Sequence, residues 1–431
     1  MIVSIVSPGT YTYGSLVLGG VLKERGHTVT VTHRLRSDGE VTLLSLFSTG
    51  QLLDPRIRDF VKTLPTVYVG GPVGFCPEIV LGELDVDAVV VGEGEDVVAS
   101  LVEDGPSGDL AGVAFVEGDE IVKTKSRPVG NLDHPIPLIP EDLSSQNVRG
   151  ANVYIETHRG CLGACTFCQV PRFFGRTIRS RSLDNVLAEV RELKRAGVRR
   201  VAVSGGTGSL FGYGKDVNKG AFIELVRALS EILGPRNLSV PDMRVDFVDQ
   251  EILEAVRDYT IGWVFFGIES GSQKMLNAMR KGVTVEKNLE AVELARSCGV
   301  KVGGSFIVAY PGETEEDYEA TLEFMEDAML DDVFSSVAEP IPGTPLARLA
   351  LDYPREENLI YRKHKGEYRA LKLSEAEARC FNLMLHGQNC KLVPRLVNDA
   401  MYQSFLEEAK VQGRDIKRVM TLLEKYRDVI V

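Results

Sequence analysis

Three cysteines stand close together in the sequence, at Cys161, Cys165 and Cys168. The spacing Cys-x3-Cys-x2-Cys places three thiolates on one short loop, where they can converge on a common point. Thiolates are the usual ligands of iron–sulfur clusters, and three of them leave one iron of a four-iron cluster open to another ligand. Structural zinc needs a fourth ligand, which His158 is near enough in sequence to supply. The spacing favours the cluster over zinc and over a packing role.

The other four cysteines are scattered along the chain, at Cys76, Cys298, Cys380 and Cys390. Seven is an odd number, and the N-terminus shows no basic region ahead of an apolar stretch, as an export signal would. We therefore expect no disulfide framework. We interpret the scattered cysteines as packing residues.

The cluster loop needs a scaffold, and the hydrophobic pattern of the first third predicts strands that alternate with helices. Strands are expected at residues 1–7, 28–32, 41–47, 66–69 and 88–91, and helices at residues 16–25, 56–63 and 96–103. Such alternation predicts a parallel, doubly wound sheet, whose ligands bind at the carboxyl ends of the strands. Small residues follow four of these strands. They either let a large ligand approach the backbone or form ordinary turns.

A proline-containing stretch at residues 128–150 predicts a linker. The alternation then restarts, with strands expected at residues 153–157, 200–204, 243–247, 263–268, 300–308 and 333–338, and helices at residues 185–196, 219–233, 250–257, 285–297 and 315–328. This is a second α/β unit of about six strand–helix repeats. Residues 374–431 lack strand signals and predict a small helical C-terminal region. We therefore predict domains at residues 1–127, 151–345 and 346–431.

With its cluster loop directly after a predicted strand, the chain resembles the radical S-adenosylmethionine superfamily. Residues 204–208 resemble that superfamily's Gly-Gly-Glu turn, with Thr207 in place of the acid. Residues 266–271 resemble its Gly-x-Glu-Ser turn, residues 307–314 its Pro-Gly-Glu-Thr turn, and residues 339–345 the segment that closes the barrel. The resemblance implies a four-iron, four-sulfur cluster on the three cysteines. It also implies S-adenosylmethionine contacts at Phe167, Gly205, Gly206, Thr207, Arg244, Glu269, Ser270, Ser305 and Tyr310.

The N-terminal third resembles the cobalamin-binding domain that precedes the radical module in one subgroup of that superfamily. Residues 69–72 and 87–95 carry this resemblance. It implies a Rossmann-like cobalamin-binding domain, a partial (β/α)6 radical barrel and a small helical C-terminal region. The implied cobalamin contacts are Thr10, Tyr11, Thr12, Ser48, Thr49, Gly70, Gly71, Gly92, Glu93 and Gly94. No Asp-x-His-x-x-Gly motif occurs, so a histidine below the cobalt is not expected.

Net charge and hydropathy limit the partners. A formal charge of −12 disfavours nonspecific binding to nucleic acid or to anionic membranes. No apolar run reaches the roughly 18 residues that span a bilayer, so we expect a cytoplasmic protein with no membrane partner. A basic stretch at residues 172–200 is either a solvated helix face, paired in part by Glu189 and Glu192, or a docking surface for a protein or a phosphate-bearing group.

The resemblance implies a cobalamin-dependent radical C-methyltransferase acting on an unactivated sp3 carbon. A 5′-deoxyadenosyl radical would remove the hydrogen, and methylcobalamin would supply the methyl group. The compact length and helical tail resemble the archaeal enzymes that modify a glutamine of methyl-coenzyme M reductase in methanogens. That resemblance implies a post-translational modification of a protein or peptide substrate, with a ferredoxin or flavodoxin as electron donor.

Three other functions remain open. A non-methylating enzyme would couple the same cofactors to cyclisation or rearrangement. A tRNA methylthiotransferase would share the cofactor turns, but it would carry a second three-cysteine site in the N-terminal third, where this chain has only Cys76. A cluster-containing sensor or electron carrier would leave the cofactor turns unexplained.

Overall fold

The computed structural model describes residues 1–430 and forms two compact units. Unit 1 comprises Met1–Leu162, Gln169–Gly206 and Leu210–Ser239. Unit 2 comprises Gly163–Cys168, Thr207–Ser209 and Val240–Val431. The chain crosses from one unit to the other inside the cluster loop.

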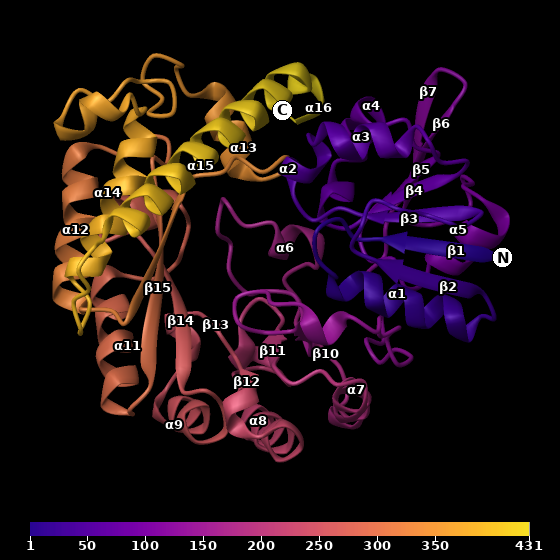
Figure 1. The fold of residues 1–431 in the computed structure, drawn as a ribbon, viewed down its shortest axis with the longest axis horizontal. Coiled ribbons are helices and arrows are strands. Elements are labelled where there is room, and N and C mark those ends of the chain that lie inside the picture. The colour runs from indigo at the N-terminus through magenta and orange to yellow at the C-terminus, as the bar shows by residue number, and fades with distance from the viewer. Residues whose placement is uncertain (431) are drawn as a thin grey trace. The chain divides into compact units, whose positions relative to one another are not determined.

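Unit 1 begins with a seven-stranded sheet in the order β2-β1-β3-β4-β5-β6-β7. Its strands are β1 (Ile2–Val6), β2 (Thr28–Thr32), β3 (Val41–Ser45), β4 (Val67–Gly70), β5 (Ala88–Val90), β6 (Val113–Glu117) and β7 (Glu120–Lys123). The first five are parallel, as expected, and lie side by side in the indigo-to-magenta part of Figure 1. The last two pair antiparallel and were not predicted. The strand order reverses between β1 and β3, which is where doubly wound sheets bind ligands.

Five helices accompany this sheet: α1 (Tyr13–Glu24), α2 (Thr49–Leu52), α3 (Pro55–Val61), α4 (Pro77–Glu83) and α5 (Val98–Asp104). Alternating apolar residues of the strands, such as Val3 and Ile5, pack with Leu22 of α1 and Leu101 of α5 in one buried cluster. The predicted linker packs against helix α1. A Cβ on Gly20 would lie 2.4 Å from the carbonyl oxygen of Ile136, so the linker backbone packs directly on the helix.

The remainder of unit 1 holds a three-stranded parallel sheet in the order β12-β11-β8 and an antiparallel pair, β9 with β10. The strands are β8 (Val153–Glu156), β9 (His158–Arg159), β10 (Arg179–Ser180), β11 (Val201–Ser204) and β12 (Leu238–Ser239). The helices are α6 (Val170–Phe173), α7 (Leu183–Arg195) and α8 (Lys219–Leu233).

Unit 2 is built on four parallel strands in the order β13-β14-β15-β16. They are β13 (Asp242–Met243), β14 (Trp263–Glu269), β15 (Lys301–Val308) and β16 (Asp332–Val337). The helices between and after them are α9 (Gln250–Tyr259), α10 (Gln273–Ala278), α11 (Val285–Ser297), α12 (Glu315–Ala328) and α13 (Pro345–Asp352).

The predicted strand at residues 243–247 is wrong over most of its length. Strand β13 ends at Met243, and Val245–Phe247 form a 3-10 turn. The guanidinium of Arg244 folds back onto the carboxylate of Asp246, with nitrogen–oxygen distances of 2.9 and 2.8 Å. That local pairing favours a tight turn over an extended chain.

The C-terminal region is helical, as expected, with α14 (Glu375–Asn389), α15 (Asp399–Lys425) and α16 (Arg427–Ile430). A capping box between Ser374 and Glu377 starts α14, which satisfies amide groups that would otherwise lack partners. Helix α14 packs on α12, α15 and β16, in the orange and yellow part of Figure 1. The predicted domain boundaries at residues 127, 150 and 345 stay a prediction.

Within residues 1–430, the helices are either too short or too polar to cross a bilayer.

Gly271, directly after β14, is required by a backbone contact. A Cβ at this position would lie 2.2 Å from the carbonyl oxygen of Ala320 in α12. We predict that Gly271→Ala lowers stability by about 2–3 kcal/mol, because backbone has to move. Gly220→Ala in α8 is the control, since its Cβ would lie 3.7 Å from the nearest atom. Thermal unfolding measures both, and equal transitions would contradict the packing.

Candidate active site

The first half of the cluster loop, in unit 1, is fixed by backbone. Gly160 has a φ of +100°, and a Cβ there would lie 2.3 Å from the carbonyl oxygen of Thr177. Only glycine meets both demands. The amide of Cys161 donates to the carbonyl oxygen of Gly175 at 3.3 Å, and Cys161 itself is buried. The segment at residues 175–177 therefore sets where the first thiol lies.

The second half of the loop, in unit 2, is clamped at Thr166. Its amide donates to the carbonyl oxygen of Met279 at 2.9 Å, and its own carbonyl accepts from the amide of Leu346 at 3.1 Å. Its hydroxyl lies 2.8 Å from the hydroxyl of Tyr310, which is almost completely buried. Phe167 packs against the same apolar cluster. Three separate segments thus hold the stretch between Cys165 and Cys168.

The donor set of this loop suits an iron–sulfur cluster. Cys161 and Cys165 are buried, Cys168 is partly buried, and no disulfide joins any cysteine within residues 1–430. The guanidinium of Arg244 lies 3.5 Å from Sγ of Cys165, where its positive charge favours the thiolate. Arg244 therefore offers Cys165 a charge that offsets the cost of burying its ionised form.

Glu269, Ser305 and Lys281 come together in unit 2. The carboxylate of Glu269 lies 2.7 Å from Nζ of Lys281, and the hydroxyl of Ser305 donates to its other oxygen at 3.5 Å. Gly267 leaves room for this pair, because a Cβ there would lie 2.6 Å from the Glu269 oxygen and 2.7 Å from the Lys281 nitrogen. Lys281 also accepts, through its carbonyl, from the guanidinium of Arg244 at 2.8 Å.

The structure thus joins three predicted residues, Arg244, Glu269 and Ser305, through one that the sequence did not reveal. Lys281 lies twelve residues after Glu269, beyond the turn that carries the motif. A lysine in the loop after a short helix is unremarkable in sequence, and only its burial singles it out.

The turn at residues 204–208 depends on its glycines. Gly205 has a φ of +154°, and a Cβ there would lie 2.4 Å from the imidazole of the fully buried His158. A Cβ on Gly206 would lie 3.9 Å from the Cβ of Cys161. The turn therefore packs closely on the residues around the first cysteine. Thr207, the residue that replaces the acid, is buried in unit 2.

Ser270 serves as a brace, since its hydroxyl lies 3.1 Å from that of Thr321 in α12. The neighbouring Pro-Gly-Glu-Thr turn is held by Glu313, which accepts from the amide of Ala309 at 2.8 Å and from Arg379 of α14 at 2.9 Å. Burial raises the pKa of Glu313 to about 7, and the Arg379 guanidinium opposes that rise. The helical C-terminal region thus supports a predicted cofactor turn.

Unit 1 contains a cavity of about 280 Å³ at the carboxyl ends of its seven-stranded sheet. That volume is near the lower end for small-molecule sites. Six predicted contacts line it: Thr12, Gly70, Gly71, Gly92, Glu93 and Gly94. The aromatic residues Tyr13, Phe47, Phe173 and Phe174 line it too. None of its described lining residues is a histidine.

Glycine backbone and small hydroxyl groups form the part of the cavity wall at the strand ends. Gly71 has a φ of +93°, and a Cβ there would lie 2.5 Å from the carbonyl oxygen of Leu46. The hydroxyls of Ser7, Thr12 and Ser45 form a chain with oxygen–oxygen distances of 3.0 Å. This chain lies at the ends of β1 and β3, where the strand order reverses. Such a wall lets a large planar ligand approach the backbone.

The other four predicted contacts lie outside the cavity lining. Thr10 and Tyr11 both contact the side-chain oxygen of Gln146, at 2.9 and 2.7 Å, so they tie the predicted linker to β1. Ser48 caps α2 and Thr49 begins that helix. Their role as cofactor contacts stays a prediction.

A buried charge network lies beside the cavity. The carboxylate of Glu93 is 2.8 Å from the guanidinium of Arg159 and 2.5 Å from that of Arg179. Arg159 also pairs with Glu95 and, at 2.6 Å, with Glu156. Burial acts to lower the pKa of Arg159, but the surrounding carboxylates outweigh it and raise that pKa. Arg159 was not predicted as a site residue, although it stands two positions before Cys161.

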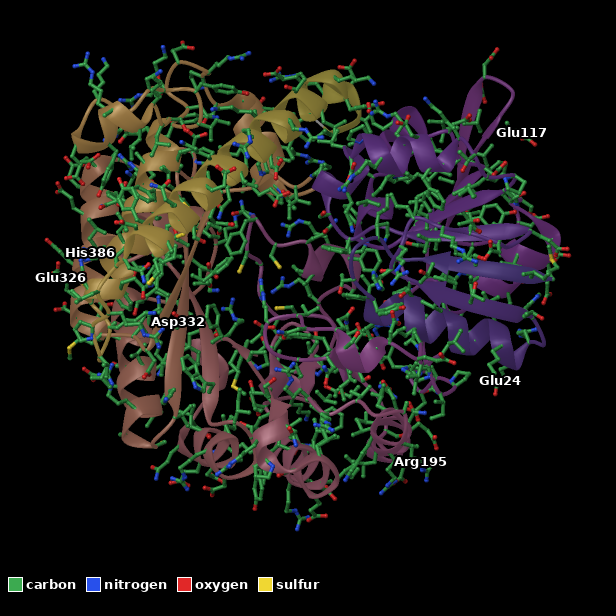
Figure 2. All side chains as sticks on the ribbon, in the orientation of Figure 1. Glu24, Glu117, Arg195, Glu326, Asp332 and His386 are labelled. Atoms are coloured by element: carbon green, nitrogen blue, oxygen red, sulfur yellow. The ribbon has the colours of Figure 1, made fainter. Side chains whose placement is uncertain are left out.

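A second buried network explains part of the basic stretch. Arg181 lies 2.6 Å from Glu189 and donates to the hydroxyl of Tyr13 at 2.7 Å. Arg195, labelled in Figure 2, pairs instead with Glu192 on the exposed face of α7. The predicted pairing by Glu189 and Glu192 is therefore present, but Arg181 is buried and Arg179 is partly buried, so neither belongs to a fully solvated helix face. A docking role for the remaining arginines stays a prediction.

Asp317 joins two cofactor turns and should make stability depend on pH. It accepts from Ser272 at 2.6 Å and from the amide of Thr314 at 2.9 Å, and it pairs with Lys274 at 2.5 Å. Burial alone raises the pKa of Asp317, but hydrogen bonds from Lys274, Ser272 and Thr314 outweigh it and hold that pKa well below its usual range. Its stabilisation is therefore present above about pH 4 and is lost as the pH falls further.

We predict that Asp317→Asn costs about 1–2 kcal/mol at pH 7, as loss of a helix cap with charged hydrogen bonds does. The difference from the parent protein should shrink as the pH falls below about 4. Urea unfolding across this pH range measures it, with Asp327→Asn, exposed on the same helix, as the control. A difference that does not depend on pH would contradict the assignment.

Comparison with known proteins gives a family match and several relatives. The Radical SAM superfamily matches residues 155–325. A Methanocaldococcus jannaschii protein, provisionally named a methylthiotransferase, is 54% identical over 442 residues, covering 100% of this chain and 97% of the relative. A tRNA-2-methylthio-N(6)-dimethylallyladenosine synthase of Aromatoleum aromaticum is 32% identical over 51% of each chain, so the chain spans about half the length of that relative.

Two solved structures share the fold. The radical S-adenosylmethionine methyltransferase TsrM of Kitasatospora setae, with cobalamin and a [4Fe-4S] cluster, has a TM-score of 0.65 at 16% identity, covering 80% of this chain and 73% of TsrM. The cobalamin-dependent S-adenosylmethionine radical enzyme OxsB has a TM-score of 0.60 at 17% identity, covering 97% of this chain and 56% of OxsB.

These matches confirm the expected fold class: a Rossmann-like N-terminal sheet, a radical (β/α) region and a helical C-terminal region. The 54% identical relative matches the whole chain. The residues that match the superfamily, 155–325, include the cluster loop and the turns at residues 204–208, 266–271 and 307–314. The chain therefore belongs to the radical S-adenosylmethionine superfamily, and it is an enzyme that uses S-adenosylmethionine with a four-iron, four-sulfur cluster.

Proposed function

We propose that the chain is a cobalamin-dependent radical S-adenosylmethionine methyltransferase that acts on an unactivated sp3 carbon. The observation that carries the proposal is the cavity at the carboxyl edge of the N-terminal sheet, lined by the glycine turns after β4 and β5. The fold likeness to TsrM and OxsB, whose structures are described with cobalamin, supports it.

Cobalamin fits the residues that line this cavity. Gly70 and Gly71, together with Gly92 and Gly94, keep side chains out of the part of the wall that follows β4 and β5. The hydroxyls of Thr12 and Ser45 offer hydrogen bonds at the strand-order reversal. Phe173 and Phe174, whose ring centroids are 4.8 Å apart, offer an apolar surface. Without a histidine among the described lining residues, we expect base-off cobalamin.

The cofactors and the protein would have different roles in the reaction. When bound, the cluster with S-adenosylmethionine would supply a radical able to remove an unactivated hydrogen, and cobalamin would supply the methyl group. The protein would orient the reactants and exclude water. Cys161, Cys165 and Cys168 would hold the cluster. Arg244 would stabilise the Cys165 thiolate, and the buried Glu269–Lys281 pair would orient the polar groups of S-adenosylmethionine.

For the substrate, we propose a glutamine side chain of methyl-coenzyme M reductase. Support comes from the compact length and from the helical C-terminal region, the layout that the archaeal glutamine-methylating enzymes have. The enzyme would then make a post-translational modification, with a ferredoxin or flavodoxin as electron donor.

Methylthiolation of tRNA is the competing function. It is favoured by the provisional name of the 54% identical relative and by the likeness to the Aromatoleum aromaticum synthase. It is opposed by the cysteine count, because residues 1–127 contain only Cys76 and not a second cluster triad. A rearrangement without methyl transfer is the third outcome that an assay should separate.

The products of one anaerobic assay distinguish these functions. Reconstituted enzyme receives reductant, cobalamin, S-adenosylmethionine and a glutamine-containing peptide of methyl-coenzyme M reductase. We predict 5′-deoxyadenosine and S-adenosylhomocysteine together, with one methyl gained by the peptide, as mass spectrometry would measure. The Cys165→Ala variant should produce neither 5′-deoxyadenosine nor methylated peptide. The Cys298→Ala variant should retain turnover.

Two results of that assay would contradict the proposal. Deoxyadenosine without S-adenosylhomocysteine would favour a rearrangement. An unmodified peptide, with methylthio groups gained by tRNA added in its place, would favour methylthiolation.

The cavity assignment makes a separate prediction for Gly94. A Cβ there would lie 3.5 Å from Leu18, so a larger side chain is tolerated by the backbone but enters the cavity. We predict that Gly94→Leu weakens cobalamin binding at least about tenfold, or about 1.4 kcal/mol, while iron content stays unchanged. Gly108→Leu is the control, because a Cβ there meets nothing within 4 Å. Equal binding by both variants in equilibrium dialysis would contradict the assignment.

A further inference from the structure

Helices α12 and α14 contact each other along their whole length and run in the same direction. Near their N-terminal ends, Arg379 of α14 lies 2.7 Å from Glu315 of α12. In the middle, Asn382 donates to the hydroxyl of Tyr318 at 2.8 Å. Near their C-terminal ends, His386 of α14 faces Glu326 of α12. The first contact is an ion pair and the second a hydrogen bond, and the third pairs an imidazole with a carboxylate beside the thiol of Cys390.

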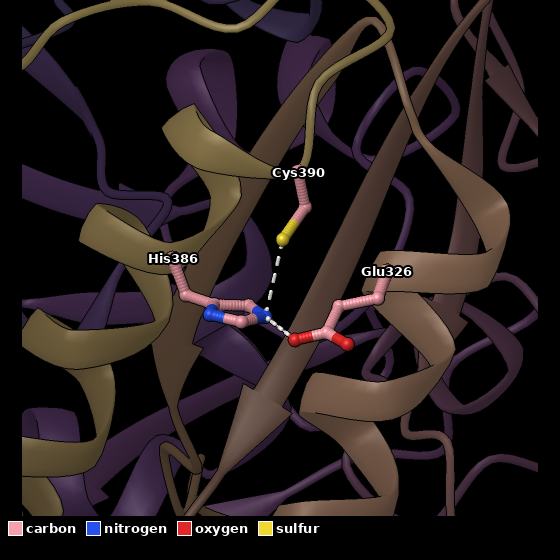
Figure 3. A group of neighbouring side chains, drawn as sticks. All are labelled: Glu326, His386 and Cys390. Carbon is pink, nitrogen blue, oxygen red and sulfur yellow. Dashed lines mark hydrogen bonds and ion pairs between the residues drawn. The ribbon is translucent and has the colours of Figure 1, made fainter.

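The third contact brings together three potential metal ligands, shown in Figure 3. Nε2 of His386 lies 3.2 Å from Sγ of Cys390 and 3.4 Å from a carboxylate oxygen of Glu326. All three ligand atoms lie within 4.8 Å of one another. His386 and Cys390 are four residues apart, so they share one face of the last turn of α14.

The two distances from His386 suit a tetrahedral ion, and the ligand atoms of Cys390 and Glu326 lie within 4.8 Å of each other. Bonds of about 2.3 Å to sulfur and about 2.0–2.2 Å to nitrogen or oxygen, at tetrahedral angles, separate neighbouring ligand atoms by about 3.4–3.6 Å. The histidine–glutamate distance of 3.4 Å agrees with that value. The histidine–cysteine distance of 3.2 Å needs only a small side-chain adjustment.

Charge also favours a cation at this point. The Glu326 carboxylate places a negative charge beside the imidazole of His386 and the thiol of Cys390. Lys391, the next residue after Cys390, pairs with Asp332 at 2.7 Å. Its positive charge is therefore balanced by that carboxylate. A divalent ion would bind the thiolate and the Glu326 carboxylate together.

We propose that Glu326, His386 and Cys390 form a zinc site that fastens the C-terminal helix α14 to α12. A thiolate, an imidazole and a carboxylate are the three ligand types that zinc accepts together, and water would complete the tetrahedron. The ion would fix the far end of the helix pair whose near end supports the Pro-Gly-Glu-Thr turn through Arg379 and Glu313. The site uses none of the cluster cysteines and does not depend on the methyltransferase proposal.

The test measures zinc on the full chain with its iron–sulfur cluster in place, so that the cluster cysteines are occupied. Protein is incubated with zinc chloride, freed of excess metal by gel filtration and analysed for zinc and iron per chain. We expect about one zinc per chain in the parent protein and in Cys298→Ser, which alters a cysteine that follows α11 and lies outside the proposed site. Cys390→Ser and His386→Gln should lose that zinc and keep the iron.

Glu326→Gln keeps the test decisive if the other variants fold poorly, because the Glu326 side chain is 61% exposed. Its zinc affinity should fall at least tenfold. Added zinc should raise the thermal unfolding temperature of the parent protein and leave that of Cys390→Ser unchanged. Cobalt substitution should give the thiolate charge-transfer band of a tetrahedral site. No retained zinc in the parent protein, or equal zinc in parent and variants, would overturn the proposal.

Discussion

Two arginines hold the buried carboxylate of Glu93, and the arrangement of unit 1 depends on this contact. Glu93 stands in the glycine turn after β5, where it lines the cavity, and Arg159 stands two residues before Cys161. Arg179 closes the network from β10. Removing one partner of a buried ion pair typically costs about 3–5 kcal/mol, because a charge is left uncompensated. The network therefore ties the start of the cluster loop to the ligand-binding edge of the N-terminal sheet.

Unit 2 fixes its part of the same loop by different means. Thr166 is clamped by Met279, Tyr310 and Leu346, and Arg244 places a positive charge beside Cys165. The cofactor turns are in turn braced by α12, through Ser270 and Asp317, and by α14, through Arg379. Helix α14 therefore supports the Pro-Gly-Glu-Thr turn directly, which gives the C-terminal region a structural role at a turn where we predict cofactor contacts.

Local features could be predicted from the sequence, and long-range partners could not. The cysteine spacing and the glycine turns are set by nearby backbone demands, as the positive φ values of Gly160, Gly71 and Gly206 illustrate. Lys281 was missed because nothing in its own segment reveals that it is buried against Glu269. The strand expected at residues 243–247 failed because the pairing of Arg244 with Asp246 outweighs a β-rich composition. Of the expected cobalamin contacts, those on glycine turns line the cavity, whereas Thr10, Tyr11, Ser48 and Thr49 have other hydrogen-bonding or capping roles.

We propose above all that one chain holds both an S-adenosylmethionine-binding cluster and a cobalamin without a histidine ligand. Electron paramagnetic resonance of the reduced, reconstituted protein tests both parts in one sample. The account predicts a protein-bound cob(II)alamin signal without nitrogen splitting, and a reduced-cluster signal that changes when S-adenosylmethionine is added. Two results would contradict this prediction: cobalamin that passes through a filter retaining the protein, or a cob(II)alamin signal split by a nitrogen ligand.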